Sequence, residues 1–215
     1  MTSSVCPIVY GPAFSPYVRA VRIYADELGL THQCSMAPEG DRIGFKSAGH
    51  LAMNPFGKVP VLIHNGQTLF ETAAICRYLD RLAPAGLLAT LDNGQQALVD
   101  QWSGAAAQYG GECLMKGFLL EFAFPKGENG QPRMDVIMAN LPTARSFLNI
   151  ISQQLRQHEW LAGDAYSMAD SILTPFVYYA ASVPDLDGQG ALVSANPVLA
   201  DYLQRVSTRP SARVL

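Results

Sequence analysis

Residues 54–74 constrain the fold of this chain more than any other segment does. Residues 59–63 are apolar and β-branched, and residues 67–70 follow them after Asn65-Gly66, a strong signal for a tight hairpin turn. From residue 72 to residue 82 the apolar side chains recur at helical spacing. A hairpin followed directly by a helix predicts a sheet with helices packed on it.

The residues before this segment alternate between strand and helix signals. Residues 8–10 predict a strand, and Ser15-Pro16 predicts a helix start, because Ser is a favoured N-cap and Pro is favoured at the first helical position. That helix is expected to stop at Gly29. Residues 31–36 predict another strand, and residues 39–51 are irregular or weakly helical. Residues 1–83 therefore predict an α/β domain of order βαβαββα.

The composition changes after residue 83. Residues 84–94 are rich in Pro, Gly, Asp and Asn and predict a linker. Residues 95–122 are apolar at helical spacing, with an interruption expected at Gly110-Gly111. Residues 137–155 give a second helical face, which Pro142 should bend, and further helices should start after Ser167 and at Asn196-Pro197. We expect residues 95–215 to form an all-helical domain.

Composition argues against several classes of function. The 215 residues are 49% hydrophobic and 15% charged, with a formal net charge of −3, which offers nucleic acid no basic surface. No apolar run approaches the ~20 residues of a membrane helix, and residues 1–7 lack the features of a signal peptide. The four cysteines form no C-x-x-C pair and no zinc-site pattern. We expect a cytoplasmic protein with no metal and no membrane or nucleic-acid partner.

Two features of residues 54–74 predict a site for a ligand with peptide and amino-acid character. Pro60 begins a strand, and a cis bond before it would turn the backbone of Val59 toward a bound peptide, whereas a trans turn is the alternative. At the next helix start, the first-turn N–H groups favour a carboxylate and Glu71 favours an ammonium group. The alternative is ordinary capping by Thr72, with Glu71 solvated.

Several runs resemble the soluble glutathione transferase superfamily, serine type, in order and spacing. They are Tyr10-Gly11 with Ser15-Pro16, Asn54-Pro55-Phe56-Gly57-Lys58-Val59-Pro60, and Phe70-Glu71-Thr72-Ala73-Ala74-Ile75. Looser matches are Trp160-Leu161-Ala162-Gly163-Asp164, Ser167-Met168-Ala169-Asp170 and Arg209-Pro210-Ser211. The resemblance spans nearly the whole chain. It implies a thioredoxin-like domain, an all-helical domain and a homodimer that acts in detoxification.

The resemblance also implies where the co-substrate glutathione would bind. Val59, with Pro60 after it, would pair with the cysteinyl backbone, and Glu71 and Thr72 would hold the γ-glutamyl end. Lys46 and Lys58 would meet the glycine carboxylate. The pocket for a small hydrophobic electrophile would include Phe14, Tyr109 and Cys113, although a core helix explains the last two equally well.

Ser15 is predicted to activate the glutathione thiol. A free thiol has a pKa of about 8.5, and a hydroxyl donor at the positive end of a helix favours the thiolate. The alternatives are that Ser15 is only an N-cap, or that Tyr10 contacts the thiol. Other glutathione-dependent activities (isomerase, dehalogenase, peroxidase) and a non-catalytic scaffold also stay open. Arg19, one turn after Ser15, has solvation or a salt bridge as its default role.

Overall fold

The computed structural model describes residues 6–38 and 40–215. The expectation about a signal peptide concerns residues 1–7 and thus falls mostly outside the described part. The chain divides into two compact units: residues 1–96 together with 209–215, and residues 97–208. No described helix is long and apolar enough to cross a membrane.

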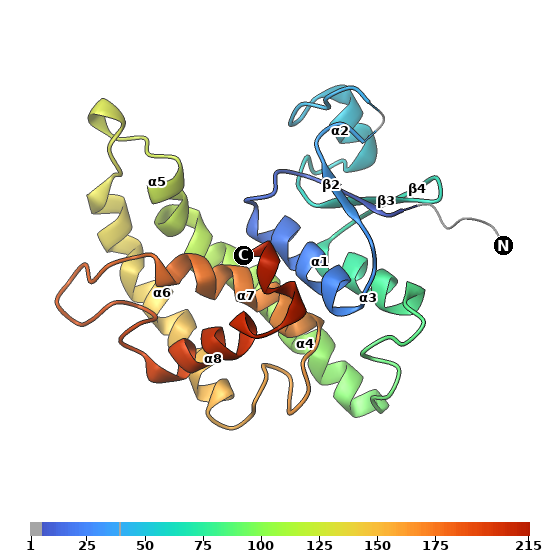
Figure 1. The fold of residues 1–215 in the computed structure, drawn as a ribbon. Helices are drawn as coiled ribbons and strands as arrows, with labels where there is room; N and C mark the ends of the chain where they lie inside the picture. The colour runs from blue at the N-terminus through green and yellow to red at the C-terminus, as the bar shows by residue number, and fades with distance from the viewer. Residues whose placement is uncertain (1–5, 39) are drawn as a thin grey trace. The chain divides into compact units, whose positions relative to one another are not determined.

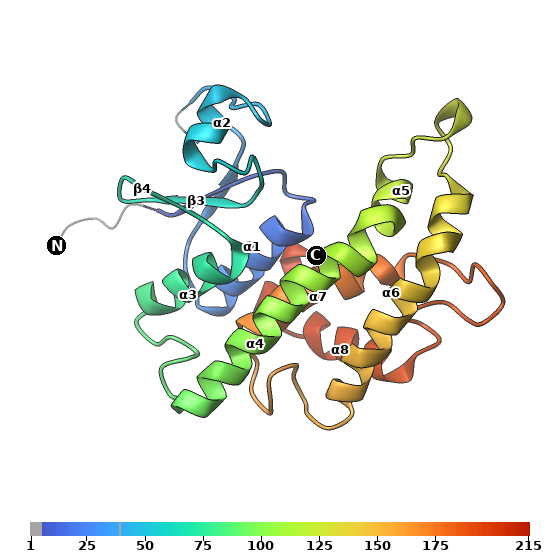
Figure 2. The ribbon, with the colours of Figure 1, turned by 180° about the vertical axis from the view of Figure 1, so that it is seen from behind.

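The first unit is built around a four-stranded mixed sheet. Its elements are β1 (Ile8–Tyr10), α1 (Pro16–Glu27), β2 (Gln33–Ser35), α2 (Ala48–Met53), β3 (Val61–His64), β4 (Gln67–Phe70) and α3 (Thr72–Leu82). The strand order is β2-β1-β3-β4, with β2 parallel to β1 and the other pairs antiparallel. Helices α1 and α3 lie on one side of the sheet and α2 on the other (Figures 1 and 2). The predicted thioredoxin-like order is confirmed.

Local sequence signals explain most of these boundaries. Asn65 and Gly66 have φ of 50° and 75°, as a type I′ hairpin turn requires, and they set His64 opposite Gln67. Pro16 occupies the first turn of α1, and Gly29 has the left-handed φ of 66° just beyond its end. β3 begins at Val61 and not at residue 59 as predicted, because Pro60 has no N–H for the ladder.

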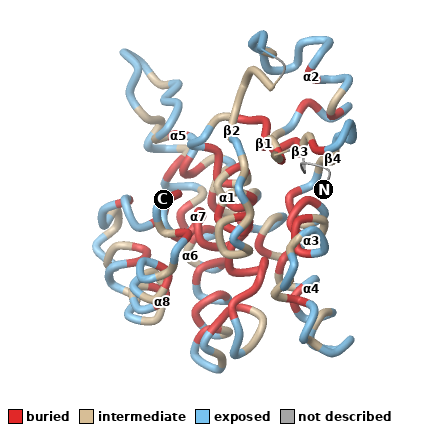
Figure 3. Tube along the Cα trace, turned by 45° about the vertical axis from the view of Figure 1, so that its right-hand side comes forward, coloured by how far each residue is buried: buried red, intermediate tan, exposed pale blue. Residues whose placement is uncertain are grey.

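The second unit is helical. Its elements are the remainder of α4 (Asn93–Tyr109), η1 (Gly110–Leu119), α5 (Leu120–Ala123), η2 (Glu128–Gly130), α6 (Met134–Leu155), α7 (Met168–Ala181) and α8 (Pro197–Ser207). Helix α7 is buried over most of its length and forms the core of this unit (Figure 3). Pro142 lies inside α6, as predicted. The predicted all-helical second domain is confirmed.

The long first helix of this unit changes its path twice. At Gly110 the α-helix gives way to the wider π-type segment η1, and a Cβ at Gly110 would lie 3.0 Å from the ring of Phe176 on α7. The helical path itself breaks at Lys116 and Gly117, where Gly117 has a φ of 73°. The interruption predicted at Gly110-Gly111 is therefore a change of helix type, and the break follows one to two turns later.

A capping box starts α7. The hydroxyl of Ser167 accepts a hydrogen bond from the N–H of Ala169, and Oδ2 of Asp170 accepts one from the N–H of Ser167 at 3.1 Å. Oδ1 of Asp170 accepts from the N–H of Leu161 at 2.8 Å. Asp170 is fully buried, and burial raises its pKa from 3.8 to about 6. The predicted capping box is confirmed, and it also ties Leu161 to α7.

The last residues return to the first unit. There η3 (Pro210–Val214) packs on α1, and Arg209 donates two hydrogen bonds to Glu27 at 3.0 and 2.6 Å. Ser211 also donates to Glu27, and Arg213 donates to Asp26. The sequence predicts one domain for residues 95–215, but residues 209–215 group with the first unit, to which these ion pairs and the Ser211 hydrogen bond attach them.

Candidate active site

Three loops of the first unit meet at one end of the sheet because of its register. Tyr10, the last residue of β1, pairs with Val61, the first residue of β3, and Val61 pairs with Phe70, the last residue of β4. The loop after β1, the turn before β3 and the start of α3 are therefore neighbours. These segments contain Ser15, Val59-Pro60 and Glu71-Thr72, respectively. Ser35, the last residue of β2, pairs with Tyr10, so the loop that leads to Lys46 leaves from the same end.

Gly11 brings the first two loops into contact. A Cβ at this position would lie 3.1 Å from Cβ of Val59 and 2.5 Å from Cγ2 of Val18 on α1. Gly11 also has a φ of 144°, where side chains are rarely accommodated. Only a glycine therefore lets the backbone between β1 and Ser15 pass this close to Val59.

Ser15 stands at the N-cap position of α1 but does not cap the helix with its side chain. Its backbone has the extended values φ −63° and ψ 129°, and its carbonyl accepts from the N–H of Arg19 at 2.9 Å. The residue is 9% exposed, and its hydroxyl forms no hydrogen bond with any described residue. The hydroxyl is thus available to a ligand at the positive end of α1.

Tyr10 is engaged elsewhere. Its hydroxyl donates to the carbonyl of Ile43 at 3.0 Å, and its side chain is fully buried. Desolvation raises the pKa of Tyr10, while the charge of Arg42 works in the opposite direction. These contacts weigh against Tyr10 as the group that contacts a thiol.

Arg19 holds the loop that precedes Ser15. Its Nε donates to the carbonyl of Ala13 at 3.3 Å, and the N–H of Ser15 donates to the carbonyl of Pro12 at 3.0 Å. Arg19 is half-buried and bonded to this loop, which argues against a fully solvated side chain, and a salt bridge stays the other default interpretation.

The bond between Val59 and Pro60 is cis, so the predicted isomer is confirmed and the trans turn is wrong. Val59 is half-buried and Pro60 is buried. Neither the N–H nor the C=O of Val59 forms a hydrogen bond with a described residue. Both backbone groups are available to pair with an extended peptide, in the manner of an added strand.

Glu71 takes the N-cap position of α3, and Thr72 is the first helical residue. Glu71 has a φ of 72° and an exposed side chain that makes no capping hydrogen bond, whereas Thr72 is buried. The capping alternative that made Thr72 the N-cap is therefore wrong by one position. A positive φ in a residue other than glycine costs roughly 1–2 kcal/mol, and such strained residues cluster at ligand sites.

Lys46 and Lys58 are both exposed and lie near each other. A Cβ at Gly57 would lie 3.2 Å from Cγ of Lys46, so the stem of Lys46 runs beside the residue that precedes Lys58. Between them lies His50, which hydrogen-bonds to the backbone of both lysines. Sequence analysis missed His50, because its partners are backbone groups that no residue pattern reveals.

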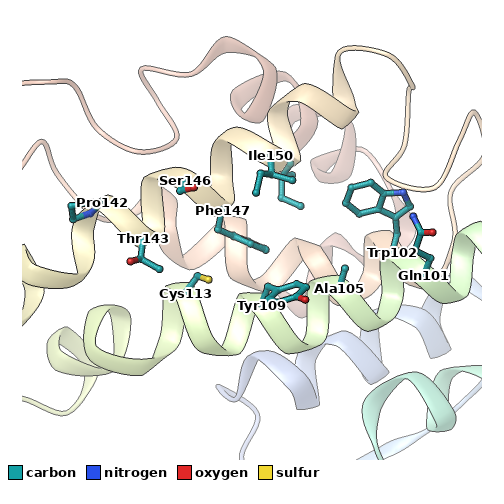
Figure 4. A pocket seen from close by; sticks show the side chains of 11 residues that line it. Gln101, Trp102, Ala105, Tyr109, Cys113, Pro142, Thr143, Ser146, Phe147 and Ile150 are labelled. Atoms are coloured by element: carbon teal, nitrogen blue, oxygen red, sulfur yellow. The ribbon is translucent and has the colours of Figure 1, made fainter.

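The second unit contains a cavity of about 570 Å³ between α4–η1 and α6. Side chains of α4 and η1 face side chains of α6 across it (Figure 4). The lining residues are Gln101, Trp102, Ala105, Tyr109, Cys113, Pro142, Thr143, Ser146, Phe147, Ile150 and Ile151. Tyr109 is 49% exposed, which argues against a core role, and burial raises the pKa of Cys113. Phe14 is exposed and belongs to the first unit.

Among the described residues, the cysteines and the other potential metal-binding side chains form no second candidate site. All four thiols are free, and burial raises the pKa of Cys34, Cys76 and Cys113, which disfavours their thiolates at neutral pH. Within residues 6–38 and 40–215, no three His, Cys, Asp or Glu side chains are grouped so that they can hold a metal ion.

Comparisons with known proteins agree with this geometry. Residues 14–82 match the family model described as glutathione S-transferase, N-terminal domain, and residues 136–205 match the corresponding C-terminal domain. Glutathione S-transferase 4 of Zea mays is 31% identical over 95% of this chain and 89% of its own length. A probable glutathione S-transferase, GSTF1, of Oryza sativa subsp. japonica is 27% identical over 96% of this chain and 94% of its own length.

Solved structures show the same fold along the whole chain. The structure of a glutathione S-transferase-I bound with lactoylglutathione superposes on this chain with a TM-score of 0.80 at 25% identity. The match covers 98% of each chain. Glutathione transferase F2 from Populus trichocarpa superposes with a TM-score of 0.78 at 27% identity and covers 97% of this chain and 96% of its own. The chain therefore belongs to the glutathione S-transferase family.

Proposed function

We propose that this protein is a glutathione transferase in which Ser15 activates the thiol of glutathione. The observation that carries the proposal is the Ser15 hydroxyl, which sits at the N-terminus of α1 and makes no capping bond. A thiol with a pKa of about 8.5 is only a few per cent ionised at pH 7. A hydroxyl donor together with the helix N-terminus stabilises the thiolate and lowers that pKa.

The reaction follows from the stabilised thiolate. The thiol proton leaves to solvent, and the sulfur donates its electron pair to an electrophilic carbon of the second substrate. A carbon–sulfur bond forms. With an aromatic halide the carbon–halogen bond breaks, and the halide leaves with the electrons of that bond. With an isothiocyanate nothing leaves, because the electrons of the C=N π bond move to the nitrogen, which takes up a proton from solvent. Ser15 donates a hydrogen bond throughout and is not itself the nucleophile.

The rest of the glutathione site is proposed from the loops at the same end of the sheet. The free N–H and C=O of Val59, before the buried Pro60, pair with the cysteinyl backbone. Glu71 meets the γ-glutamyl ammonium group, and Thr72 with the first turn of α3 meets its carboxylate. Lys46 and Lys58 meet the glycine carboxylate. Strain at Glu71 and the free backbone of Val59 support this placement.

We propose Phe14, Tyr109 and Cys113 as contacts of a small hydrophobic electrophile. For Tyr109 and Cys113 the support is the cavity that they line in the second unit. Tyr109→Ala should raise KM for the electrophile and leave the Kd of glutathione unchanged. Equal effects on both substrates would count against this assignment.

A cytoplasmic homodimer is proposed alongside the activity. Each unit exposes large apolar side chains that a second copy of the chain can cover, among them Phe45 and Phe56 in the first unit and Leu98 in the second. Light scattering of the purified protein should give twice the mass of one chain. A monomer at micromolar concentration would contradict this assignment.

The deciding experiment measures consumption of glutathione with aromatic halides, isothiocyanates and peroxides. We expect conjugate formation with at least one aromatic halide or isothiocyanate. Free glutathione recovered with a rearranged substrate would instead indicate an isomerase. Tight binding of glutathione without turnover, and without thiolate absorbance at neutral pH, would indicate a non-catalytic scaffold.

A further inference from the structure

His50 joins the two lysines of the proposed site through the backbone. Its Nδ1 lies 3.0 Å from the backbone nitrogen of Lys46, and its Nε2 lies 3.1 Å from the carbonyl oxygen of Lys58. An N–H can only donate and a carbonyl can only accept. These two contacts therefore define a neutral ring with its proton on Nε2, which donates to Lys58, while Nδ1 accepts from Lys46.

The ring is held in place on all sides. His50 is fully buried, and its ring centroid lies 5.1 Å from that of Tyr10 and 5.8 Å from that of Phe45. The backbone N–H of His50 donates to the hydroxyl of Ser47, the N-cap of α2. A side chain with both ring nitrogens bound and no exposed surface cannot touch a ligand, so any effect it has on binding is exerted through its partners.

The two lysines depend on His50 to different degrees. The carbonyl of Lys58 accepts a second hydrogen bond, from Nδ2 of Asn54 at 2.9 Å, so it stays anchored without His50. Lys46 has a φ of 58°, a strained value for a residue other than glycine. The hydrogen bond to His50 fixes its N–H in that conformation.

We propose that His50 is a positioning residue for the glycine end of glutathione. It fixes the backbone of Lys46 beside Lys58, so that both ammonium groups meet one carboxylate. The inference rests on the proposed function, because it takes that carboxylate as the partner of the two lysines. It assigns His50 no part in thiol activation, since its hydrogen bonds reach neither Ser15 nor Val59.

The test compares glutathione with γ-glutamylcysteine, which has the same thiol and γ-glutamyl group but lacks glycine. His50→Phe keeps an aromatic ring and removes both hydrogen bonds. We expect its Kd for glutathione to rise about tenfold, as for one or two lost hydrogen bonds and a misplaced charge, and its Kd for γ-glutamylcysteine to change less than about twofold. The kcat at saturating glutathione and the pKa of the bound thiol should stay at wild-type values.

Two further variants separate the two hydrogen bonds. The oxygen of His50→Asn can replace Nδ1 as acceptor for Lys46, whereas the amide nitrogen of His50→Gln reaches toward Lys58. We expect His50→Asn to retain the preference for glutathione over γ-glutamylcysteine better than His50→Gln does. The reason is that Lys58 keeps Asn54 as a second anchor, whereas Lys46 needs the acceptor at position 50. These variants carry the test if His50→Phe fails to fold, as judged by circular dichroism.

His64→Gln is the matched control. His64 is also buried in the first unit and hydrogen-bonds to the hydroxyl of Tyr78 at 2.7 Å, so its replacement lowers stability without involving either lysine. We expect it to leave the ratio of the two Kd values unchanged. An unchanged ratio in every folded His50 variant, or equal losses for both ligands, would overturn the inference alone. Wild-type protein that binds neither ligand would overturn the proposed function itself.

Discussion

At the scale of single residues, the distinctive feature is a hydroxyl without a structural task. Ser15 occupies a helix N-cap, yet its side chain forms no hydrogen bond to the helix. Tyr10, the other hydroxyl considered for the same role, is buried and bonded to Ile43. The two residues are close in sequence, and their surroundings separate their roles.

Ser15→Ala should therefore lower kcat with little effect on binding. Removing one donor to a developing or resident anion typically costs about 10²-fold in rate. The pKa of the bound thiol should rise toward the free value of about 8.5, which a pH titration of thiolate absorbance measures. Glu71→Gln is the complementary variant and should raise the Kd of glutathione with less effect on kcat. If both variants changed only Kd, Ser15 would not be the activating group.

At the scale of elements, the helix starts and the glycines give the clearest energetic consequences. The capping box of α7 places a carboxylate where no water reaches it, and α4 carries glycines within its helical span. Both features predict measurable changes in stability that are independent of glutathione.

Asp170 should make stability fall as pH rises from about 4 to about 6. Burial raises its pKa from 3.8 to about 6, so the folded protein holds the proton more tightly than the unfolded chain does. The contribution of Asp170 is most favourable below the unfolded pKa and is about 3 kcal/mol less favourable above the folded one. Urea unfolding should show that wild type loses stability relative to Asp170→Asn between these limits. A difference in unfolding free energy between wild type and Asp170→Asn that does not change with pH would contradict this prediction.

Gly104→Ala should stabilise the protein by about 0.5–1 kcal/mol. Gly104 lies in the interior of α4, is exposed, and a Cβ there would have no neighbour within 4 Å. Gly110→Ala is the contrasting variant, because its Cβ would meet the ring of Phe176 at 3.0 Å. Thermal unfolding should move Tm upward for the first variant and downward for the second.

At the scale of the whole molecule, the end of the chain completes the first unit. Glu27 on α1 is 3% exposed in its side chain and is bonded to Arg209 and Ser211. Arg209→Ala leaves a buried carboxylate without its charge partner and should cost about 2–4 kcal/mol. Arg156→Ala, an exposed substitution, should stay within about 0.5 kcal/mol. Urea unfolding measures both, and equal effects would show that the Glu27 pair is not a stabilising link.

Features that depend on neighbouring residues follow from the amino-acid sequence alone. Asn65-Gly66 defines a hairpin, Pro16 and Asn196-Pro197 mark helix starts, and Ser167 with Asp170 forms a capping box, because each acts on backbone groups a few residues away. The resemblance to the transferase family then indicated Ser15, Val59 and Glu71 as site residues.

The way in which distant segments meet follows from tertiary packing. The register of β1, β3 and β4 brings Ser15, Val59 and Glu71 to one end of the sheet, and Gly11 allows the close approach to Val59. His50 acquires its place from two backbone groups, and residues 209–215 return to α1 through ion pairs. These contacts join residues far apart in the chain, and their energy depends on packing that local propensity and periodicity do not encode.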